Sequence, residues 1–295
     1  MKFRTDLAIE RKAMLDEEYG GKTDHDGVMV EKYEFDEDIR CTRIQILNSE
    51  GEKRLGKPAG NYVTLEVTGL LEDIPQIKER AGHALAEELK KMIRFHYYLK
   101  VLVIGIGNKD VTPDALGPRS ANKVRVTRHL FNMFGADGDE ECGCVSCVVP
   151  GVTGMTGIET AELIKNAVEL TKPEVVIIID SLAARSIERV STTIQINDTG
   201  IEPGSGMGNM RQPLNEAYLG CRVIAIGVPT VIDAATIIRE ALEAHMDDAV
   251  QINEYVEKHH QELIVTSTDI DQLIKDFSDI ISNGINKTVH PGIYS

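Results

Sequence analysis

The sequence predicts an α/β protein with a doubly wound, largely parallel sheet. The first observation is three short, β-branched apolar runs at Lys100–Gly107, Val175–Asp180 and Arg222–Gly227. Because these runs are apolar on both faces, they suit strands that are covered on both sides. The second is that segments with helical spacing separate the runs, as in parallel strands joined by helices. The third is alternating polarity over residues 27–70, which predicts an added antiparallel layer at the N-terminal end.

Before the first core strand, the pattern favours a helix and then antiparallel strands. A helix is expected around Leu7–Glu18, and an antiparallel pair over residues 27–47 with a charged turn at Asp36–Asp38. Gly60–Gly69 predicts a further strand. Apolar residues at roughly helical spacing predict a helix over Gln76–Phe95.

Beyond the first core strand, helix and strand patterns alternate. Pro118 suits the first position of a helix, which we expect to continue over Asn122–Phe134. Cys144–Pro150 predicts a strand, and Thr156–Leu170 predicts a helix that Thr156 would cap.

The last third of the chain follows the second core strand. It contains a short strand at Thr192–Ile196 and a glycine-rich loop at Asn197–Arg211. One or two helices are expected over Ile232–His259, and an amphipathic helix over Asp269–Ile285. Because neither a repeat nor an interdomain linker is evident, we expect a single α/β domain over residues 1–295.

Composition limits the class of protein. The formal net charge of −15 argues against an electrostatic grip on nucleic acid or on an anionic membrane. No stretch approaches the roughly 20 apolar residues of a membrane span, and MKFRTDLAIER carries charges where a signal peptide would be apolar. Five cysteines, an odd number, suit a reducing compartment. We therefore expect a cytoplasmic protein.

Two aspartates follow the core-strand patterns. Asp180 ends the second run, and Asp114 lies shortly beyond the first. Since ligands bind at the carboxyl ends of parallel strands, both carboxylates reach one crevice if the two strands are neighbours. Such a pair shares a proton, and it can deprotonate a water and protonate a leaving group. The simpler alternative is that each aspartate caps the next helix, and Asp233 is a third candidate of this kind.

The other motifs have simple interpretations. Gly105-Ile106-Gly107 lacks the third glycine of a dinucleotide fingerprint, so we expect a tight turn and no cofactor. Cys142, Cys144 and Cys147 form CxCxxC, but a structural zinc site needs four ligands, so buried thiols are favoured. Asp198-Thr199-Gly200 matches the tripeptide of pepsin-type proteases, but in an α/β chain a turn is favoured. His129 lies on a helical pattern and is most simply structural.

Longer runs carry a resemblance. They cover most of residues 100–235 and a patch at the N-terminus: FRTDLAIE (3–10), NYVTLE (61–66), VLVIGIGNKDVTPDALGPRSANKVRVTRHLF (101–131), VVPGVTGMTGIET (148–160), IIDSLAARSIERVSTTIQINDTGIEPGSGMGN (178–209) and VIAIGVPTVIDA (223–234). On these runs the chain resembles the germination protease family of spore-forming bacteria.

The resemblance implies a function and two site residues. Proteases of this family degrade small acid-soluble proteins that coat DNA in dormant spores, so a cytoplasmic location in the spore core is implied. They are atypical aspartic endopeptidases on a phosphorylase/hydrolase-like sheet, similar to that of hydrogenase-maturation peptidases. Their essential aspartates lie in TPDALGP and IDSLAAR motifs, which here contain Asp114 and Asp180. A homotetramer made as a self-cleaving zymogen is also implied.

The family's cleavage preference suggests a processing site. It takes an acidic residue before the cut, then a hydrophobic residue and alanine, and Asp6-Leu7-Ala8 fits this order. We therefore expect self-cleavage between Asp6 and Leu7, with residues 1–6 as a short pro-segment, since only Met1 and Lys2 precede FRTDLAIE.

An acidic substrate residue also calls for a basic side chain in the cleft. Candidates are Arg185, Arg119 and Arg128. The loop with Asp198 and Gly206 is a further candidate for the cleft. Backbone N–H groups at Gly105–Asn108 or in the loop 204–208 are candidates for stabilising the oxyanion.

Two alternatives remain. In a metal-dependent peptidase of the hydrogenase-maturation type, Asp114, Asp180 and His129 would be the ligands, although two carboxylates suit hard cations better than zinc. A non-catalytic binding protein that keeps only the fold is the other. The helices expected over residues 240–295 carry no resemblance to the Bacillus-type members.

Overall fold

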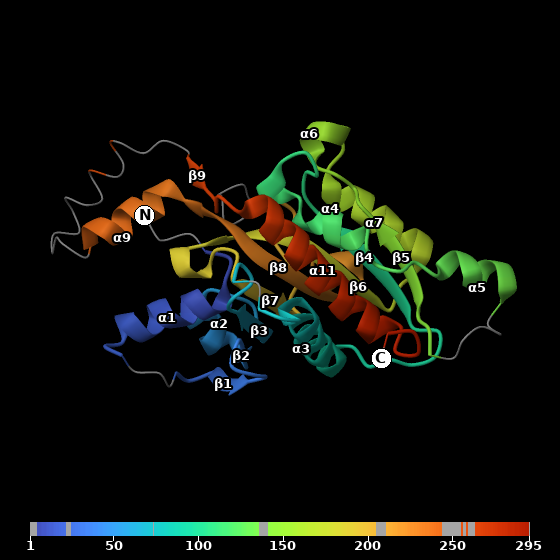
Figure 1. Cartoon of the computed structure of the whole chain (residues 1–295), viewed down its shortest axis with the longest axis horizontal. Helices are drawn as coiled ribbons and strands as arrows, with labels where there is room; N and C mark the ends of the chain where they lie inside the picture. Colours follow the sequence, from blue (N-terminus) through green and yellow to red (C-terminus); the bar gives the residue numbers. More distant parts are fainter. Residues whose placement is uncertain are drawn as a thin grey trace.

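One mixed sheet, covered by helices on both faces, organises the chain (Figure 1). The structure is a computed structural model, and it describes residues 5–21, 25–72, 74–135, 141–204, 211–243, 255, 258 and 263–294. Within these residues the sheet has nine strands: eight follow the order β1-β2-β3-β7-β8-β6-β4-β5, and β9 pairs with the end of β8. The predicted α/β class is therefore confirmed.

The parallel half of the sheet contains the three predicted core strands. β4 (Lys100–Gly105) lies between β5 (Cys144–Val148) and β6 (Val175–Ala184), and β6 pairs in parallel with β8 (Arg222–Asp233). Their apolar side chains are almost wholly buried, because helices cover both faces. The carboxyl ends of β4, β6 and β8 lie at the same edge of the sheet.

The antiparallel half continues from β8. β7 (Thr193–Asn197) pairs antiparallel with both β8 and β3 (Gly60–Val67), and β2 (Ile39–Ile46) and β1 (Val28–Glu34) follow. The antiparallel addition expected at residues 27–70 is present, and it joins the parallel half edge to edge through β7.

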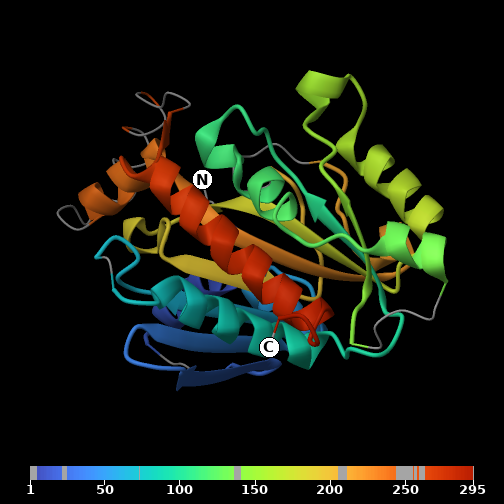
Figure 2. The ribbon, with the colours of Figure 1, turned by 45° about the vertical axis from the view of Figure 1, so that its right-hand side comes forward.

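Three helices cover one face. α3 (Ile77–Met92) and α11 (Ile270–Val289) lie side by side (Figure 2), and α4 (Leu116–Ala121) packs next to α11 over β4 and β6. Alternate strand residues, such as Val103 and Ile177, join these helices in the largest apolar cluster.

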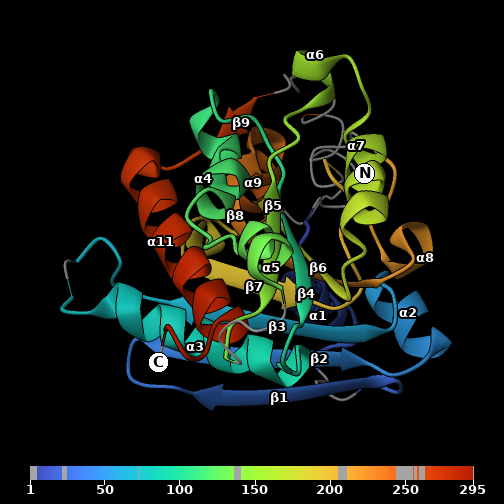
Figure 3. The same cartoon turned by 90° about the vertical axis from the view of Figure 1, so that its right-hand side faces the viewer.

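The other face carries four helices among the described residues. α7 (Thr160–Thr171) and α8 (Glu216–Leu219) contribute to a cluster over the parallel strands, while α1 (Ala8–Glu18) and α2 (Ser49–Leu55) cover β2 and β3. Figure 3 shows these four on the side of the strands opposite α3 and α11. The result is a doubly wound, three-layer arrangement.

The remaining elements are short, and two predicted helices differ in extent. The short elements are η1 (Thr112–Asp114), α5 (Arg128–Phe134), α6 (Thr153–Thr156), η2 (Ile187–Arg189), α9 (Ala234–Glu243) and β9 (Ile264–Val265). The prediction of one helix from Pro118 to Phe134 is wrong. Thr127 interrupts it, because its backbone N–H donates to Val145 and its hydroxyl donates to the carbonyl of Gly143.

Thr156 does not cap the next helix, because it ends α6 instead. Gly157 follows with a φ of 71°, which stops α6, and α7 begins at Thr160. Of the helices expected over Ile232–His259, α9 is observed, while most of residues 244–262 lie outside the described residues. No helix in the described part of the chain is long and apolar enough to cross a membrane.

Candidate active site

Asp180 lies within a strand, not at its end. β6 continues past it to Ala184, because residues 181–184 keep pairing with β8. The Asp180 side chain is buried, and its Oδ1 accepts a hydrogen bond from the Ser181 backbone N–H at 2.8 Å. The prediction that the strand ends at Asp180 is therefore wrong, although the residue still lies at the carboxyl edge of the parallel half.

Asp114 ends the short η1 turn that follows β4. Its Oδ2 accepts a hydrogen bond from the Asn108 backbone N–H at 2.7 Å, which ties the carboxylate to the preceding turn. Gly107 in that turn has a φ of 120°, and a Cβ there would lie 2.1 Å from the Asp114 carbonyl oxygen. Only glycine fits this position, so the prediction of a tight turn at Gly105–Gly107 is confirmed.

Close backbone packing fixes Asp114 relative to Asp180. A Cβ on Gly117, in α4, would lie 2.1 Å from the carbonyl oxygen of Ile106 and 2.5 Å from that of Ile179. The helix that follows Asp114 therefore packs directly on the end of β4 and on the residue before Asp180.

An irregularity in β8 supports the same turn. The pairing of β6 with β8 shifts after Leu182, which leaves Thr230 as an extra residue on β8. Its hydroxyl donates to the carbonyl oxygen of Pro113 at 2.7 Å, next to Asp114. Bulges commonly redirect side chains beside active sites, and this one holds η1 in place.

The two carboxylates line one cavity of about 440 Å³. It lies at the carboxyl edge of the parallel strands, which is the edge where the sequence places it. Its other lining residues include Asp6, Gly107, Val152, Ser181, Ile201, Glu202, Arg211, Thr230 and Ile264.

Burial dominates the electrostatics of the pair. Burial raises the pKa of Asp180 well above its ordinary value, and the negative charge of Asp114 raises it further. Burial also raises the pKa of Asp114, while the Asn108 N–H and the charge of Arg211 oppose this. The pair therefore favours a state with one proton, which Asp180 holds more readily.

Arg211 is a cavity residue that the sequence did not indicate. It lies at the rim and donates to the Thr153 hydroxyl at 3.2 Å, and its charge opposes the raised pKa of both aspartates. It is the last residue of the glycine-rich loop. Hydrophobic periodicity in the sequence does not predict where such a loop lies in space.

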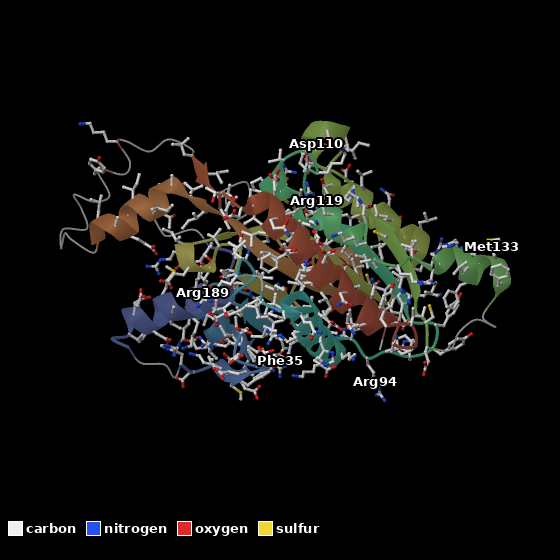
Figure 4. All side chains as sticks on the ribbon, viewed as in Figure 1. Phe35, Arg94, Asp110, Arg119, Met133 and Arg189 are labelled. Atoms are coloured by element: carbon white, nitrogen blue, oxygen red, sulfur yellow. The ribbon has the colours of Figure 1, made fainter. Side chains whose placement is uncertain are left out.

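The three arginines proposed from the sequence lie elsewhere. Arg185 forms ion pairs with Glu17 at 3.7 Å and Glu240 at 3.3 Å. Arg119 is exposed on α4 (Figure 4), and Arg128 lines a small cavity with Lys100 at the opposite edge of the sheet.

The remaining carboxylates proposed from the sequence have structural contacts. The Asp198 carboxylate accepts from the backbone and side-chain N–H groups of Asn61 in β3, both at 2.7 Å. Asp233 accepts from Ala235 at the start of α9. Gly206 and most of the loop 204–208 lie outside the described residues. Of the N–H groups at Gly105–Asn108, those of Ile106 and Asn108 already donate to Ile179 and Asp114.

His129 is not beside the aspartates. It is exposed on α5, which precedes β5 at the amino-terminal edge of the parallel strands. Figure 4 shows Met133 of the same helix at the right-hand end of the molecule, away from Asp110, which precedes η1 and lies at the top. Across the described ranges, no three His, Cys, Asp or Glu side chains form a group that could hold a metal ion. The carboxylates of Asp114 and Asp180 alone could offer oxygen ligands to a hard cation.

The CxCxxC cysteines are buried or half-buried thiols without a disulfide. Cys142 contacts Nδ1 of His290 at 3.1 Å, and the Cys147 thiol donates to the Ala121 carbonyl. Burial raises the pKa of Cys147 to about 11, so it is a poor nucleophile.

The first described residues of the chain lie beside the site. Asp6, the residue before the expected cut, lines the cavity of the two aspartates. Its backbone N–H donates to the Ala183 carbonyl at 3.1 Å, and its carboxylate accepts from the Ala183 N–H at 2.9 Å. Leu7 is fully buried.

The fold is of the α/β class, and two carboxylates share a cavity at the carboxyl edge of its parallel strands. Comparison with family models then identifies the family, because the model described as Peptidase_A25, Germination protease, matches residues 5–251. The chain belongs to the germination protease family and is a protease.

Curated relatives are similar over nearly the whole chain. Germination proteases from Clostridium perfringens (strain ATCC 13124) and Caldanaerobacter subterraneus subsp. tengcongensis are 40% and 42% identical; each covers 98% of this chain, and 96% and 95% of the relative, respectively. The one from Bacillus pumilus is 36% identical over 98% of this chain and 94% of its own. This coverage extends into residues 240–295, where the sequence alone showed no resemblance. Among solved structures, the [NiFe] hydrogenase maturation protease HycI from Thermococcus kodakarensis KOD1 covers 68% of this chain and 99% of its own, with 14% identity and a TM-score of 0.37.

Proposed function

We propose that this protein is an endopeptidase that starts the degradation of small acid-soluble, DNA-binding spore proteins during germination. The observation that supports a carboxylate mechanism is that Asp114 and Asp180 line one cavity, where burial raises both pKa values and the charge of Asp114 raises that of Asp180 further. Family membership supports the germination role and the spore substrate. A homotetramer, a single α/β domain and a place in the cytoplasm of the spore core are parts of the same proposal.

The two aspartates take different roles in this mechanism. Asp180, the more strongly shifted, holds the proton and donates a hydrogen bond to the scissile carbonyl. Asp114, whose ionised form the Asn108 N–H stabilises, takes a proton from the attacking water. The C–N bond breaks as that proton passes to the leaving nitrogen. Arg211 at the rim offers positive charge near the developing oxyanion.

Self-cleavage between Asp6 and Leu7 belongs to the same proposal. The carbonyl of this peptide bond accepts a hydrogen bond from the Gln195 side chain at 3.1 Å, and Asp6 lines the cavity of the catalytic pair. The position of Asp6 at the cavity supports cleavage at this bond.

Peptide cleavage tests the carboxylate pair. A peptide containing Glu-Ile-Ala is incubated with wild type, Asp114→Asn and Asp180→Asn, each with and without a strong chelator. Both variants should lose at least about 10²-fold in kcat/KM, since each removes an acid–base group. Asp110→Asn, an exposed aspartate just before η1, is the matched control and should retain activity.

The chelator separates the two mechanisms. Full wild-type activity in chelator supports the carboxylate pair. Reversible loss, restored by one metal, would make the aspartates metal ligands and overturn the mechanism. If the wild type cuts no spore-protein peptide under any condition, the chain keeps the fold for binding only.

A further inference from the structure

A small cavity lies at the amino-terminal edge of the parallel strands, on the opposite edge of the sheet from the two aspartates. It has a volume of about 90 Å³ and lies between α5, the first residues of β4 and β5, and the C-terminal end of α7 (Figures 1 and 2). Since one water molecule takes about 30 Å³, the cavity has room for a few waters or for one small ion. Its polar lining side chains include Tyr98, Lys100, Arg128, Asn132, Ser146 and Thr171.

The sheet register brings three of the lining side chains together. Lys100 begins β4 and pairs with Cys144, the first residue of β5. Paired residues of neighbouring strands share a face, and so do residues two positions apart in one strand, so Lys100, Cys144 and Ser146 point to the same side of the sheet. Arg128 and Asn132 of α5 line the cavity from above this edge, and they are one helical turn apart.

The lining residues include two cations and no carboxylate. Within the described ranges, no Asp or Glu oxygen lies within 4.0 Å of the Lys100 ammonium or of the Arg128 guanidinium. Glu174 contacts only the backbone N–H of Lys100, at 3.2 Å, and its other oxygen pairs with His96. Both positive charges act on the buried Cys144 thiol, where they oppose the rise in its pKa that burial causes. The two cations therefore converge on one place without an anion between them.

Two neutral donors and an aromatic ring complete the lining. In the part of the chain that the structure describes, the Asn132 amide and the Ser146 hydroxyl form no hydrogen bond. The Lys100 Nζ lies 5.2 Å from the centre of the Tyr98 ring, and that ring contacts Phe131 of α5 edge to face, with the ring centres 5.2 Å apart. Four side chains that can donate hydrogen bonds thus face one cavity.

The sequence around α5 has the opposite charge to the chain as a whole. Residues 115–136 contain four cations, Arg119, Lys123, Arg125 and Arg128, and no Asp or Glu, whereas the whole chain has a formal net charge of −15. Such a positive region in an acidic protein favours small anions as ligands.

We propose that this cavity binds a small tetrahedral oxyanion of the phosphate class. The Arg128 guanidinium can hold two of its oxygens and the Lys100 ammonium a third, while Asn132 and Ser146 supply neutral donors. Donors that come from three different elements suit a tetrahedral ion better than a planar carboxylate. Because the bound ion joins α5 to β4 and β5, it stabilises the folded protein. The site is separate from the catalytic cavity and does not depend on the proposed peptidase function.

Thermal unfolding with inorganic phosphate tests the site. At equal ionic strength, phosphate should raise the Tm of the wild type by about 3 °C or more above its value in sodium chloride, and the shift should saturate. Lys100→Gln and Arg128→Gln should each lose most of this shift, whereas Lys100→Arg should keep it. In sodium chloride alone, both glutamine variants should unfold within about 2 °C of the wild type, because neither cation has an ion pair to lose.

The matched control is Arg119→Gln, at an exposed arginine of α4 in the same positive segment, which should keep the full phosphate shift. Titration calorimetry should show one phosphate bound per wild-type chain and none bound to Lys100→Gln. Adenosine monophosphate should bind at least about tenfold more weakly than phosphate, because the cavity has no room for a nucleoside. Equal or tighter binding of the nucleotide would overturn the assignment to a small free ion.

Three other results would overturn the site. The first is a wild-type Tm that is the same in phosphate and in sodium chloride. The second is a shift that grows with phosphate concentration and never saturates. The third is a phosphate shift of wild-type size in both glutamine variants.

Discussion

At the scale of single residues, Asp180 and Asp114 differ in how their charge is compensated. Asp180 is buried in the middle of a strand, with one backbone N–H as its hydrogen-bond partner among the described residues. Asp114 lies on a turn that is built around its carboxylate by Asn108 and Gly107. The difference makes one group the natural acid of the pair and the other the natural base.

The raised pKa of Asp180 makes protein stability depend on pH. The pKa of this carboxyl is higher in the folded protein than in the unfolded chain, where it is about 4. Its contribution to the free energy of unfolding is therefore fully present below the unfolded-state pKa, and it is lost as pH rises through the folded-state pKa. Asn cannot ionise, so Asp180→Asn should match wild type at low pH and become the more stable protein as pH rises. Each 1 kcal/mol of difference should appear as roughly 2–4 °C in Tm.

Thermal unfolding from about pH 3 to pH 8 measures this effect. Asp110→Asn, at an exposed position, should show no such divergence from wild type. A variant that is less stable than wild type at neutral pH would contradict the assignment of a buried, repelled carboxyl.

The sequence identifies a site residue where that residue follows a core-strand pattern. Asp114 and Asp180 were identified because parallel strands end at one edge of the sheet. Arg211 was not, because it lies in a connection. The position of a connection in space depends on the packing of distant elements, which no local period encodes.

At the scale of elements, the contact of α4 with the end of β4 and with the middle of β6 sets the geometry of the site. Gly117→Ala should break it, because the new Cβ would meet the Ile106 and Ile179 carbonyl oxygens at 2.1 and 2.5 Å. Because these are backbone atoms, they cannot move aside as a flexible side chain can. The free energy of unfolding should therefore fall by about 1–3 kcal/mol or more. Cleavage should fall with it, as η1 shifts.

Chemical denaturation and peptide cleavage check this prediction together. Gly154→Ala in α6 is the control, since its Cβ would meet no atom within 4 Å. Without a clash, alanine in a helix should be neutral or stabilising by up to about 1 kcal/mol. If both variants behave alike, close packing of α4 does not position the site.

Element boundaries were less predictable than element types. The strand pattern of β6 stops at Asp180, yet pairing with β8 carries the strand to Ala184 through SLAA, which has no β-branched residue. Residues 122–127 favour a helix locally, but Thr127 bonds to the neighbouring β5 segment instead. In both cases a partner strand overrides the local preference.

At the scale of the whole molecule, the N-terminal segment joins distant parts. Asp6 and Glu10 bond to the backbone at Ala183, Arg185 and Ser186, and the Gln195 amide of β7 holds the same segment. The order of strands around it could not be read from the sequence. β7 lies between β3 and β8, which are far apart in the chain, and only the complete sheet defines that neighbourhood.

Processing at the Asp6–Leu7 bond should therefore be visible on the intact protein. Aged, acidified wild type should lose six residues by mass and begin at Leu7 by N-terminal sequencing. Asp114→Asn should keep its original N-terminus under the same conditions. Wild-type protein that still begins at residue 1 or 2 would refute self-cleavage at this bond.

The mid-strand position of Asp180 also limits how the gene can change. Side chains in a strand alternate between faces, so adding or deleting one codon between Val175 and Ile179 would turn the carboxylate toward the wrong side of the sheet. A few residues further on, the irregularity at Leu182 and Ala183 already accommodates an unmatched residue on the partner strand. In laboratory-evolved variants of this gene, we expect no single-codon insertions or deletions in β6 before Asp180. We expect such changes to be tolerated only after Asp180, and sequencing the variants would show this pattern.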